Sequence, residues 1–578
     1  MQFITRTFLF AALVVLAGST VVTAMPPHPD LLNQVAAGKK ASSFYLDNRD
    51  ALREQGLCRP SDQIKRALFA AKEAASASAS SEAGTPFRIL ALLVEFSDHQ
   101  NQVNAPFFDS LVFDSMGATV RDYFSEISYA QIDLVTVNLP STLDWRTAPQ
   151  TYAYYVNNQQ GLGSYPQNSQ KLVEDLVDQV DPLVDFSQYD NDGDGYVDVV
   201  MVIHSGAGAE MTGSNADIWS HKWGINPRNK DGVFIFDYTM QPEYWTTPGD
   251  MTIGVYAHEL AHGFGLPDLY DTDGSSNGLG RWCLMAYGSW NGPGGRGDSP
   301  SHPCAWSRIN MNMANYTNVT TPLQNQIITP VEQSGLIYRM WTGGLLGQEY
   351  FLVENRQRTG YDSYLPSEGL MIWHIDDVKN ALSNPNDQEW YPGQPSSAHY
   401  GVALEPADGL WELEHAVDAG DAGDPFPGTS SRTTFSDSST PNANAYSGAP
   451  TNVQVSAITP TGDDIQANLI VTLAAGTDDD PPASLPVSAV LNQNYPNPFN
   501  PTTVISFSLT SAADVQVDIF NLMGQKVRSL YKERAASGDT ELAWDATSDS
   551  GEPVASGIYL YRMVAGEQEL TRKMVLIK

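Results

Sequence analysis

The sequence predicts an α/β domain, a β-rich domain and a small C-terminal β-sandwich, in that order, and three patterns support this prediction. In the first half, apolar runs long enough for buried strands alternate with segments whose apolar residues recur at helical spacing. From about residue 326, strands rich in aromatic and β-branched residues follow one another. After a linker rich in Asp and Pro, residues 487–578 show the alternating pattern of short sandwich strands.

Residues 1–24 have the pattern of an export signal. Arg6 precedes an apolar run, Phe8–Leu16, and Val22 and Ala24 are small residues at the −3 and −1 positions that signal peptidases accept. The run is too short for a membrane-spanning helix, and no other stretch reaches about 18 consecutive apolar residues. We therefore expect an exported protein that has no transmembrane span once the signal is removed.

Residues 25–86 have the composition of a propeptide with a linker. Polar sequence of helical character is followed by an Ala/Ser tract, Ala70–Ser81, which lacks the large side chains that a core needs. We expect this tract to be cleavable.

The α/β half begins with a buried strand, Phe87–Phe96. A helix is expected over Val120–Ala130, and a strand over Ile132–Leu139. A second buried strand is expected over Tyr196–His204, and Val233–Met240 is a candidate edge strand. The apolar residues that repeat at helical spacing before the second buried strand are Leu172, Val173, Leu176, Val177, Val180 and Val184.

An acidic loop between that helix and the second buried strand is a candidate calcium site. Its oxygen-bearing residues occupy alternate positions and Gly195 is sixth, as at the start of an EF-hand loop. Position twelve is Met201 instead of a bidentate glutamate, so we expect an isolated structural Ca²⁺ loop. A turn stabilised by Asp and Gly without a metal is the alternative. The candidate calcium ligands are Asp190, Asp192, Asp194, Tyr196 and Asp198.

The stretch His-Glu-Leu-Ala-His-Gly-Phe-Gly-Leu-Pro-Asp contains the elements of a catalytic zinc site. His258 and His262 lie four residues apart and therefore on one face of a helix. Glu259 lies about 100° further round, facing the open zinc position. Gly265 allows a sharp helix end, after which the chain can return with Asp268 as third ligand. Three protein ligands with one free position are typical of catalytic zinc; a buried helix that carries two histidines without a metal is the alternative.

The segment Cys-Leu-Met-Ala-Tyr-Gly-Ser-Trp completes a family likeness. Together with the zinc motif and the following Leu-Tyr-Asp, Met285 at seventeen residues beyond Asp268 resembles the metzincins, and most closely the immune-inhibitor-A peptidases. The resemblance implies an α/β metzincin-like catalytic domain, with Met285 on a turn beneath the metal. Tyr287 matches the place where astacins and serralysins have a tyrosine that can approach zinc, so it is a second catalytic candidate.

The three cysteines have separate interpretations. Cys283 and Cys304 flank the glycine-rich loop after the methionine turn and could form a disulfide in an exported protein. Cys58 lies in the expected propeptide. Its thiolate could occupy the open zinc position, as in the cysteine switch of matrix metallopeptidases; an unpaired thiol in a discarded segment is the alternative.

Two strands of the β-rich region, Glu349–Asn355 and Gly369–Asp376, resemble the region that follows the catalytic half in immune-inhibitor-A relatives. His374 lies in the second strand, and its apolar neighbours favour a hydrogen-bonded structural histidine over a metal ligand. A later acidic loop is a candidate for a further calcium site. Its acidic residues are Asp418, Asp421 and Asp424.

The C-terminal module contains the expected strands Val504–Leu509 and Val515–Phe520. Several of its motifs resemble the type A sorting tail of the type IX secretion system: Asn494–Pro501, Gly524 with Gln-Lys-Val, Trp544 with Asp, Ser556–Tyr559 and Arg572–Lys578. This resemblance implies export by secretion machinery of an outer membrane, followed by removal of the tail or attachment to the surface.

Length and charge limit the number of domains and the classes of partner that are possible. A chain of 578 residues is too long for one core, and its net charge of −35 argues against nucleic acid and anionic membranes as partners. The expected organisation is a signal peptide (1–24), a propeptide with linker (25–86), a catalytic domain (87–325), a β-rich domain (326–475), a linker (476–486) and a sorting β-sandwich (487–578).

We therefore expect a secreted or surface-attached zinc endopeptidase that cleaves extracellular proteins. A metal-activated water would attack the peptide bond, with Glu259 as the general base. The alternative is a surface adhesin or binding protein with an inactive peptidase domain, against which the intact Glu259 argues.

Overall fold

The structure, a computed structural model, describes residues 24–54, 85–380, 385–472 and, with short gaps, 489–576. The expected signal up to residue 23, Cys58, the Ala/Ser tract and the linker at 476–486 lie outside the described residues. Among the described helices, none has both the length and the apolar character needed to cross a membrane.

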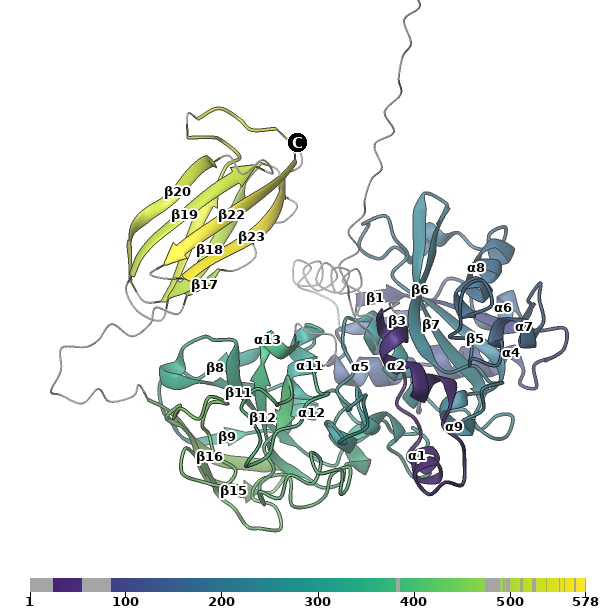
Figure 1. Cartoon of the computed structure of the whole chain (residues 1–578), viewed down its shortest axis with the longest axis horizontal. Helices are drawn as coiled ribbons and strands as arrows, with labels where there is room; N and C mark the ends of the chain where they lie inside the picture. Colours follow the sequence, from purple (N-terminus) through teal and green to yellow (C-terminus); the bar gives the residue numbers. More distant parts are fainter. Residues whose placement is uncertain are drawn as a thin grey trace, which may run out of the picture.

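A five-stranded sheet in the order β4-β2-β5-β7-β6 organises the first half of the described chain (Figure 1). Its strands are β2 (Leu90–Glu95), β4 (Arg146–Thr147), β5 (Val200–Ala207), β6 (His221–Lys230) and β7 (Val233–Tyr244). All pairs are parallel except β6 with β7. The expectation that Val233–Met240 forms an edge is wrong, because β6 covers β7 and is itself the edge. The β6 sequence contains Asn, Pro, Arg and Lys and lacks the apolar pattern by which a strand is recognised.

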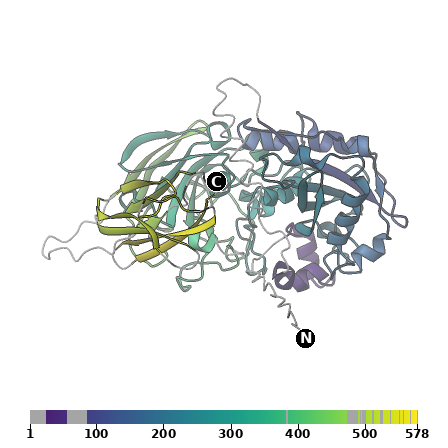
Figure 2. The same cartoon turned by 90° about the horizontal axis from the view of Figure 1, so that it is seen from above.

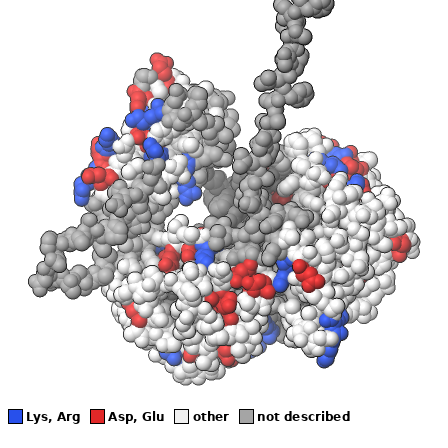
Figure 3. Space-filling view, viewed as in Figure 1, with Lys and Arg blue, Asp and Glu red and all other residues white. Residues whose placement is uncertain are grey.

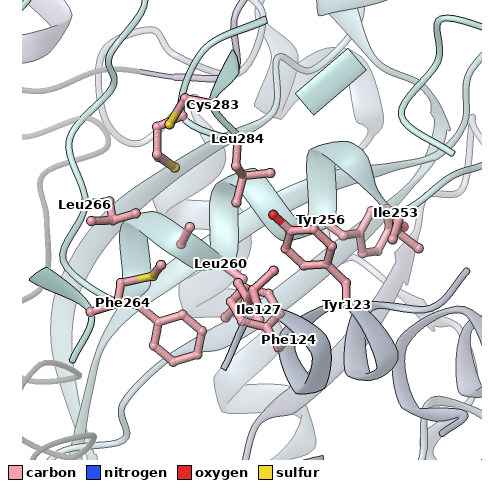
Figure 4. Packing of buried hydrophobic residues seen from close by; sticks show 14 of the residues in the cluster. Tyr123, Phe124, Ile127, Ile253, Tyr256, Leu260, Phe264, Leu266, Cys283 and Leu284 are labelled. Carbon is pink, nitrogen blue, oxygen red and sulfur yellow. The ribbon is translucent and has the colours of Figure 1, made fainter. Parts of the chain in front are cut away.

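The two faces of this sheet pack against different helices. On β2, Ala91 and Leu93 belong to the core that contains α10, whereas Leu90 and Leu92 belong to the core that contains α8. Figure 4 shows the first core, where Tyr256 and Leu260 of α10 lie beside aromatic residues of α5. The helices of this half are α4 (Ala105–Phe113), α5 (Val120–Ile127), α6 (Pro140–Leu143), α7 (Tyr152–Val156), α8 (Ser169–Val180), α9 (Ala209–Thr212) and α10 (Gly254–Gly263).

Several expected elements are shorter than the sequence pattern suggested. The single strand expected from Phe87 is divided, because β1 (Thr85–Arg88) pairs with β3 (Ile132–Val135) in a separate parallel sheet. The strand β3 ends at Val135, before the expected end at Leu139, and the chain then enters α6. The helix α5 ends at Ile127 because Tyr129 and Ala130 adopt positive φ angles of 56° and 57°.

The second buried strand also begins later than expected. β5 starts at Val200, and Tyr196 makes only an isolated parallel bridge to Phe234. The acidic loop is thus separated from the regular strand by a short irregular segment.

The β-rich part contains two sheets that enclose one core, in the orders β13-β12-β11-β10-β8 and β14-β15-β16-β9. Leu352 and Trp373 on the five-stranded sheet share a core with α10, so this part packs directly against the α/β half, as Figures 1 and 2 both show. The strands are β8 (Tyr316–Asn318), β9 (Leu323–Ile328), β10 (Ile337–Met340), β11 (Glu349–Arg356), β12 (Gly369–Asp376), β13 (Val402–Leu404), β14 (Thr434–Ser436), β15 (Val453–Thr461) and β16 (Asp464–Val471). The strand β8 and the start of β9 precede residue 326.

The C-terminal residues form two antiparallel sheets, β17-β18-β21 and β20-β19-β22-β23, which contribute to a single core around Phe507, Val517 and Trp544. The strands are β17 (Ala489–Leu491), β18 (Thr503–Leu509), β19 (Ala513–Asn521), β20 (Lys526–Ala535), β21 (Gly538–Trp544), β22 (Gly557–Ala565) and β23 (Gln568–Leu576).

The remaining short elements connect these layers. They are α1 (Pro29–Ala36), α2 (Phe44–Glu54), α11 (Ala305–Asn310), α12 (Val331–Ser334) and α13 (Asp377–Asn380), with 3₁₀ turns η1 (Phe186–Tyr189), η2 (Gly280–Trp282), η3 (Tyr287–Trp290), η4 (Thr342–Gly344) and η5 (Gly360–Tyr364).

Candidate active site

The helix α10 is buried along its whole length, which fixes the orientation of every side chain on it. It starts at Gly254, where an added Cβ would lie 2.0 Å from the carbonyl oxygen of Ser289, so only glycine allows this close approach. His258 and His262 project from one face with ring centroids 4.8 Å apart. The predicted pair of histidines on one helix face is therefore present.

The chain turns back after α10 and brings Asp268 to the two histidines. Gly265 has φ 88°, the positive angle predicted for this turn. An Asp268 carboxylate oxygen lies 3.0 Å from Nε2 of His258 and 3.4 Å from Nε2 of His262. All three side chains are buried, and their candidate ligand atoms lie within 4.8 Å of one another.

The histidine tautomers can be deduced from their other ring nitrogens. Nδ1 of His258 is 3.0 Å from the carbonyl oxygen of Leu284, and Nδ1 of His262 is 2.8 Å from that of Leu266. A carbonyl only accepts hydrogen bonds, so each Nδ1 carries the proton and each Nε2 presents a lone pair. Both Nε2 atoms and both Asp268 carboxylate oxygens are buried without a hydrogen-bond partner.

This donor set fits a divalent cation. Two lone pairs and a carboxylate oxygen that converge without a proton between them are unfavourable unless a positive charge lies among them. Ligands at about 2.0–2.2 Å from a tetrahedral zinc would be about 3.3–3.6 Å apart, close to the separations of 3.0 and 3.4 Å.

The pKa values of the two carboxyl groups of the site shift in opposite directions. Burial raises the pKa of Glu259 well above its ordinary value, with His258 opposing this shift. Burial also acts to raise the pKa of Asp268, but His262 and His258 beside it outweigh that effect, and the pKa of Asp268 is lowered. The ionised form of Asp268 is the form that binds a metal.

The methionine turn lies against both the helix and the third candidate ligand. Leu284 accepts the hydrogen bond from His258, and Met285 accepts one of 2.7 Å from the backbone amide of Leu269. Met285 is fully buried. Tyr287 follows in η3 and is 7% exposed, and burial raises its pKa. Its ring centroid is 6.3 Å from that of Tyr270.

Residues 24–28 lie across this site. The backbone amide of Met25 donates a hydrogen bond of 3.0 Å to Glu259 Oε1, and the indole of Trp219 donates one of 3.0 Å to the Met25 carbonyl. Ala24 pairs with His221 of β6 in an antiparallel bridge. Ala24 and Met25 are fully buried, so this segment occupies the space beside Glu259 that a substrate would need.

Three further contacts continue along the same segment. The indole of Trp290 donates a hydrogen bond of 3.2 Å to the carbonyl of Pro26, and His28 bonds through its backbone amide to the Glu210 carbonyl at 3.0 Å. The ring of His28 lies 2.9 Å from the Gly295 carbonyl. These partners could not be predicted from the sequence, because they come from distant loops that only the fold brings together.

The acidic loop brings Asp190, Asp192 and Asp194 within 4.8 Å of one another. Their carboxylates accept backbone hydrogen bonds inside the loop, such as Gly193 to Asp190 at 2.8 Å. Asp198 is not in this group; its carboxylate accepts two hydrogen bonds from Asn191, and burial raises its pKa to about 7. Tyr196 follows the group directly, and its amide donates to Asp194 at 3.0 Å.

The second acidic loop is arranged differently from the prediction. Asp421 groups with Asp408 and Glu412, not with Asp418 and Asp424. The Asp424 carboxylate instead accepts hydrogen bonds from the Trp282 indole and the Asp421 amide. Asp408, Glu412 and Asp421 are not consecutive in the chain, so their proximity could not be predicted from their spacing in the sequence.

His374 is a hydrogen-bonded structural histidine, as the sequence indicated. Its two ring nitrogens lie 3.0 Å from Glu349 and 3.1 Å from Glu405. The interpretation of Cys283 and Cys304 as a disulfide is wrong: both are buried free thiols, and the Cys304 amide lies 3.4 Å from the Cys283 sulfur.

Comparisons with known proteins support the interpretation of the central segment. Residues 111–315 match the family Immune inhibitor A peptidase M6, catalytic domain, and residues 493–569 match the FlgD Ig-like domain. The first match includes the whole stretch from His258 to Met285 and ends directly before β8. It supports a metallopeptidase domain of the immune-inhibitor-A type.

Two curated relatives carry corresponding names. The chain is 32% identical over 197 residues to Pre-pro-metalloprotease PrtV of Vibrio cholerae serotype O1, an alignment that covers 28% of this chain and 21% of that protein. It is 30% identical over 263 residues to Immune inhibitor A of Bacillus thuringiensis subsp. alesti, covering 36% of each. The chain thus spans roughly a fifth to a third of the length of these relatives.

Among solved structures, dimeric latent PorU from Porphyromonas gingivalis aligns with 45% of this chain and 20% of its own at 14% identity and a TM-score of 0.17. A likeness at that TM-score carries no argument about fold or function.

Proposed function

We propose that this chain is a secreted zinc-dependent endopeptidase that hydrolyses peptide bonds in extracellular proteins. The observation that carries the proposal is the convergence of unpartnered ligand atoms from His258, His262 and Asp268 beside a buried glutamate, Glu259. The match of residues 111–315 to a peptidase family supports the same conclusion.

Zinc held by these three residues would supply the Lewis acidity that activates a water molecule and polarises the scissile carbonyl. Glu259 would take a proton from the water and pass it to the leaving amine. Its carboxylate already accepts a hydrogen bond from a backbone amide, that of Met25. The amide nitrogen of a substrate at that place would become the leaving amine.

Cleavage of casein by the chain after residues 25–86 have been released, abolished by a chelator and restored by zinc, tests this function. The rival function is a surface adhesin or binding protein with an inactive peptidase domain. A zinc-loaded protein that cleaves neither casein nor mixed peptide libraries would favour that rival.

The metal-ligand assignment makes a separate prediction. Asp268→Ala should lower zinc affinity by about 10–100-fold or more, because it removes the only anionic ligand. The measurement is zinc retention during dialysis against a graded metal buffer. Asp273→Ala is the matched control, since Asp273 is exposed in the same loop. Equal zinc affinity of the two variants would remove Asp268 from the ligand set.

We further propose that residues 25–86 are a propeptide and that residues 487–578 are a sorting β-sandwich recognised by outer-membrane secretion machinery. Occupation of the site by residues 24–28 supports the first proposal. The sequence motifs of the C-terminal module support the second. The acidic character of the chain, visible as patches of Asp and Glu near the middle of the view in Figure 3, fits protein substrates better than nucleic acid.

Calcium at Asp190, Asp192 and Asp194 is proposed as a structural ligand, because these carboxylates would repel one another without a cation. Binding only to the folded form stabilises it by about 2.7 kcal/mol at a hundredfold excess over Kd. A calcium-selective chelator should therefore lower the Tm of the inactive Glu259→Gln protein, and Asp192→Ala should reproduce part of that fall. Asp114→Ala, at an exposed site, is the control. If neither treatment changes the Tm, the loop is a turn stabilised by Asp and Gly, and the calcium proposal is wrong.

A further inference from the structure

In the full chain, before the expected signal (residues 1–24) is removed, the peptide unit between Ala24 and Met25 is held between two side chains of the candidate active site. The amide of Met25 donates to Glu259 Oε1 at 3.0 Å, and the hydroxyl of Tyr270 donates to the carbonyl oxygen of Ala24. In a trans peptide the carbonyl and the amide point in opposite directions. Glu259 and Tyr270 therefore contact the two polar groups of this unit from opposite sides.

The segment that contains this unit pairs with the edge of the sheet at one point. Ala24 pairs antiparallel with His221 of the edge strand β6, and the next carbonyl, that of Met25, accepts from Trp219. These are contacts to backbone atoms, which every extended peptide offers. The arrangement thus indicates how the backbone of a substrate would lie beside Glu259.

The backbone beside Tyr270 is held by residues outside the expected propeptide. Tyr270 itself is 2% exposed while residues 24–54 are present, and its hydroxyl oxygen lies 3.1 Å from that of Tyr45, which belongs to the expected propeptide. The preceding residue, Leu269, is held at both its backbone groups, by Met285 at 2.7 Å and by the Leu279 amide at 2.9 Å. A donor held in this way needs little reorganisation when charge develops on the oxygen that it contacts.

We infer that Tyr270 is a further catalytic residue, whose hydroxyl donates a hydrogen bond to the carbonyl oxygen of the scissile peptide. This inference rests on the proposed peptidase function. When water adds to the carbonyl carbon, a C–O bond forms and the π electrons move to the carbonyl oxygen, which becomes negative. Tyr270 keeps its proton and stabilises that oxygen; the C–N bond then breaks, and the amine leaves with the proton that Glu259 took from the water.

The sequence favours Tyr287 for such a role, whereas the hydrogen bonds of the structure favour Tyr270. The rings lie 6.3 Å apart, but the hydrogen bond from a tyrosine hydroxyl to residues 24–28 comes from Tyr270. Within the described residues, no hydrogen bond joins Tyr287 to that segment. Tyr287→Phe is therefore a matched control for Tyr270→Phe: each removes one hydroxyl and keeps the ring that packs in the core.

The test uses the exported chain after cleavage in the Ala/Ser tract, with zinc content and Tm measured for each variant. Tyr270→Phe should lower kcat by about 10²–10³-fold with little change in KM. It should weaken binding of a phosphinic peptide, whose tetrahedral oxyanion resembles the transition state, by a similar factor in calorimetry. Binding of an ordinary peptide in the Glu259→Gln background should change much less. Tyr287→Phe should leave all these quantities near the wild-type values.

The inference is overturned if Tyr270→Phe keeps both its kcat and its affinity for the phosphinic peptide, or if Tyr287→Phe alone reproduces the loss. Those results leave the peptidase function intact, because the wild-type chain still cleaves peptides. A wild-type chain that neither cleaves peptides nor binds the phosphinic peptide would instead overturn the proposed function and this inference together.

Discussion

Replacing Glu259 by glutamine is expected to leave zinc bound and to remove nearly all turnover. The glutamate lies beside the ligand set but is not part of it, because the converging ligand atoms belong to His258, His262 and Asp268. Glutamine keeps the shape of the side chain and can still contact a backbone amide, but it cannot take a proton from water. General acid–base catalysis contributes about 10²–10⁴-fold, and Glu259 would act in both proton transfers, so the loss should be several orders of magnitude.

The measurement combines zinc stoichiometry and peptide hydrolysis on one preparation. Glu368→Gln provides a control, because this exposed glutamate loses the same charge without a place in the site. Substantial activity of the Glu259→Gln protein at full zinc occupancy would exclude Glu259 as the general base. Loss of zinc together with activity would indicate a structural defect, and His258 Nδ1, which bonds Leu284, would be the first contact to inspect.

The candidate site was predictable because its main residues are close in sequence. His258, Glu259 and His262 share one helix, so the helical repeat alone fixes which side chains lie together. Gly265 and Asp268 follow within a short turn, and the positive φ at Gly265 agrees with the prediction. Runs of four apolar residues likewise identified β11 and β12: Tyr350–Val353 in the first strand and Leu370–Trp373 in the second.

What the sequence could not provide depends on contacts between distant segments. The edge strand β6 exists because β7 supplies its hydrogen bonds, although its own composition is polar. Tyr270 stands two residues after Asp268, and that proximity was the available signal for it. The family likeness favoured Tyr287, because the contact that points to Tyr270 depends on residues 24–28, more than two hundred positions away.

The expected disulfide shows the same limit in another form. Exported proteins favour disulfides, and Cys283 and Cys304 do lie together, with the Cys304 amide 3.4 Å from the Cys283 sulfur. Sequence spacing and compartment predict this proximity, but the bond depends on side-chain geometry, and both thiols are free.

Releasing residues 25–86 from the folded chain is expected to raise peptidase activity by on the order of 100-fold. Residues 25–28 make five hydrogen bonds with residues beside the candidate active site: Met25 to Glu259, Trp219 to Met25, Trp290 to Pro26, and His28 to Glu210 and Gly295. At about 0.5–1.5 kcal/mol each, they hold the segment in place by at least about 2.5 kcal/mol. Since 1.4 kcal/mol corresponds to a tenfold change, the site would be open in roughly one molecule in a hundred.

A site for a specific protease, placed in the Ala/Ser tract of the full chain, allows this prediction to be measured. Activity is followed before cleavage, after cleavage, and after the released segment has been removed. A synthetic peptide of residues 25–54 added back should inhibit again, whereas a peptide of the same composition in scrambled order should not. Because the contacts are made by the backbone at Glu259, replacing the Met25 side chain by leucine should preserve inhibition. If the separated protein is no more active than the intact chain, residues 25–28 do not block the site in solution, and the role of residues 25–86 as an inhibitory propeptide is lost.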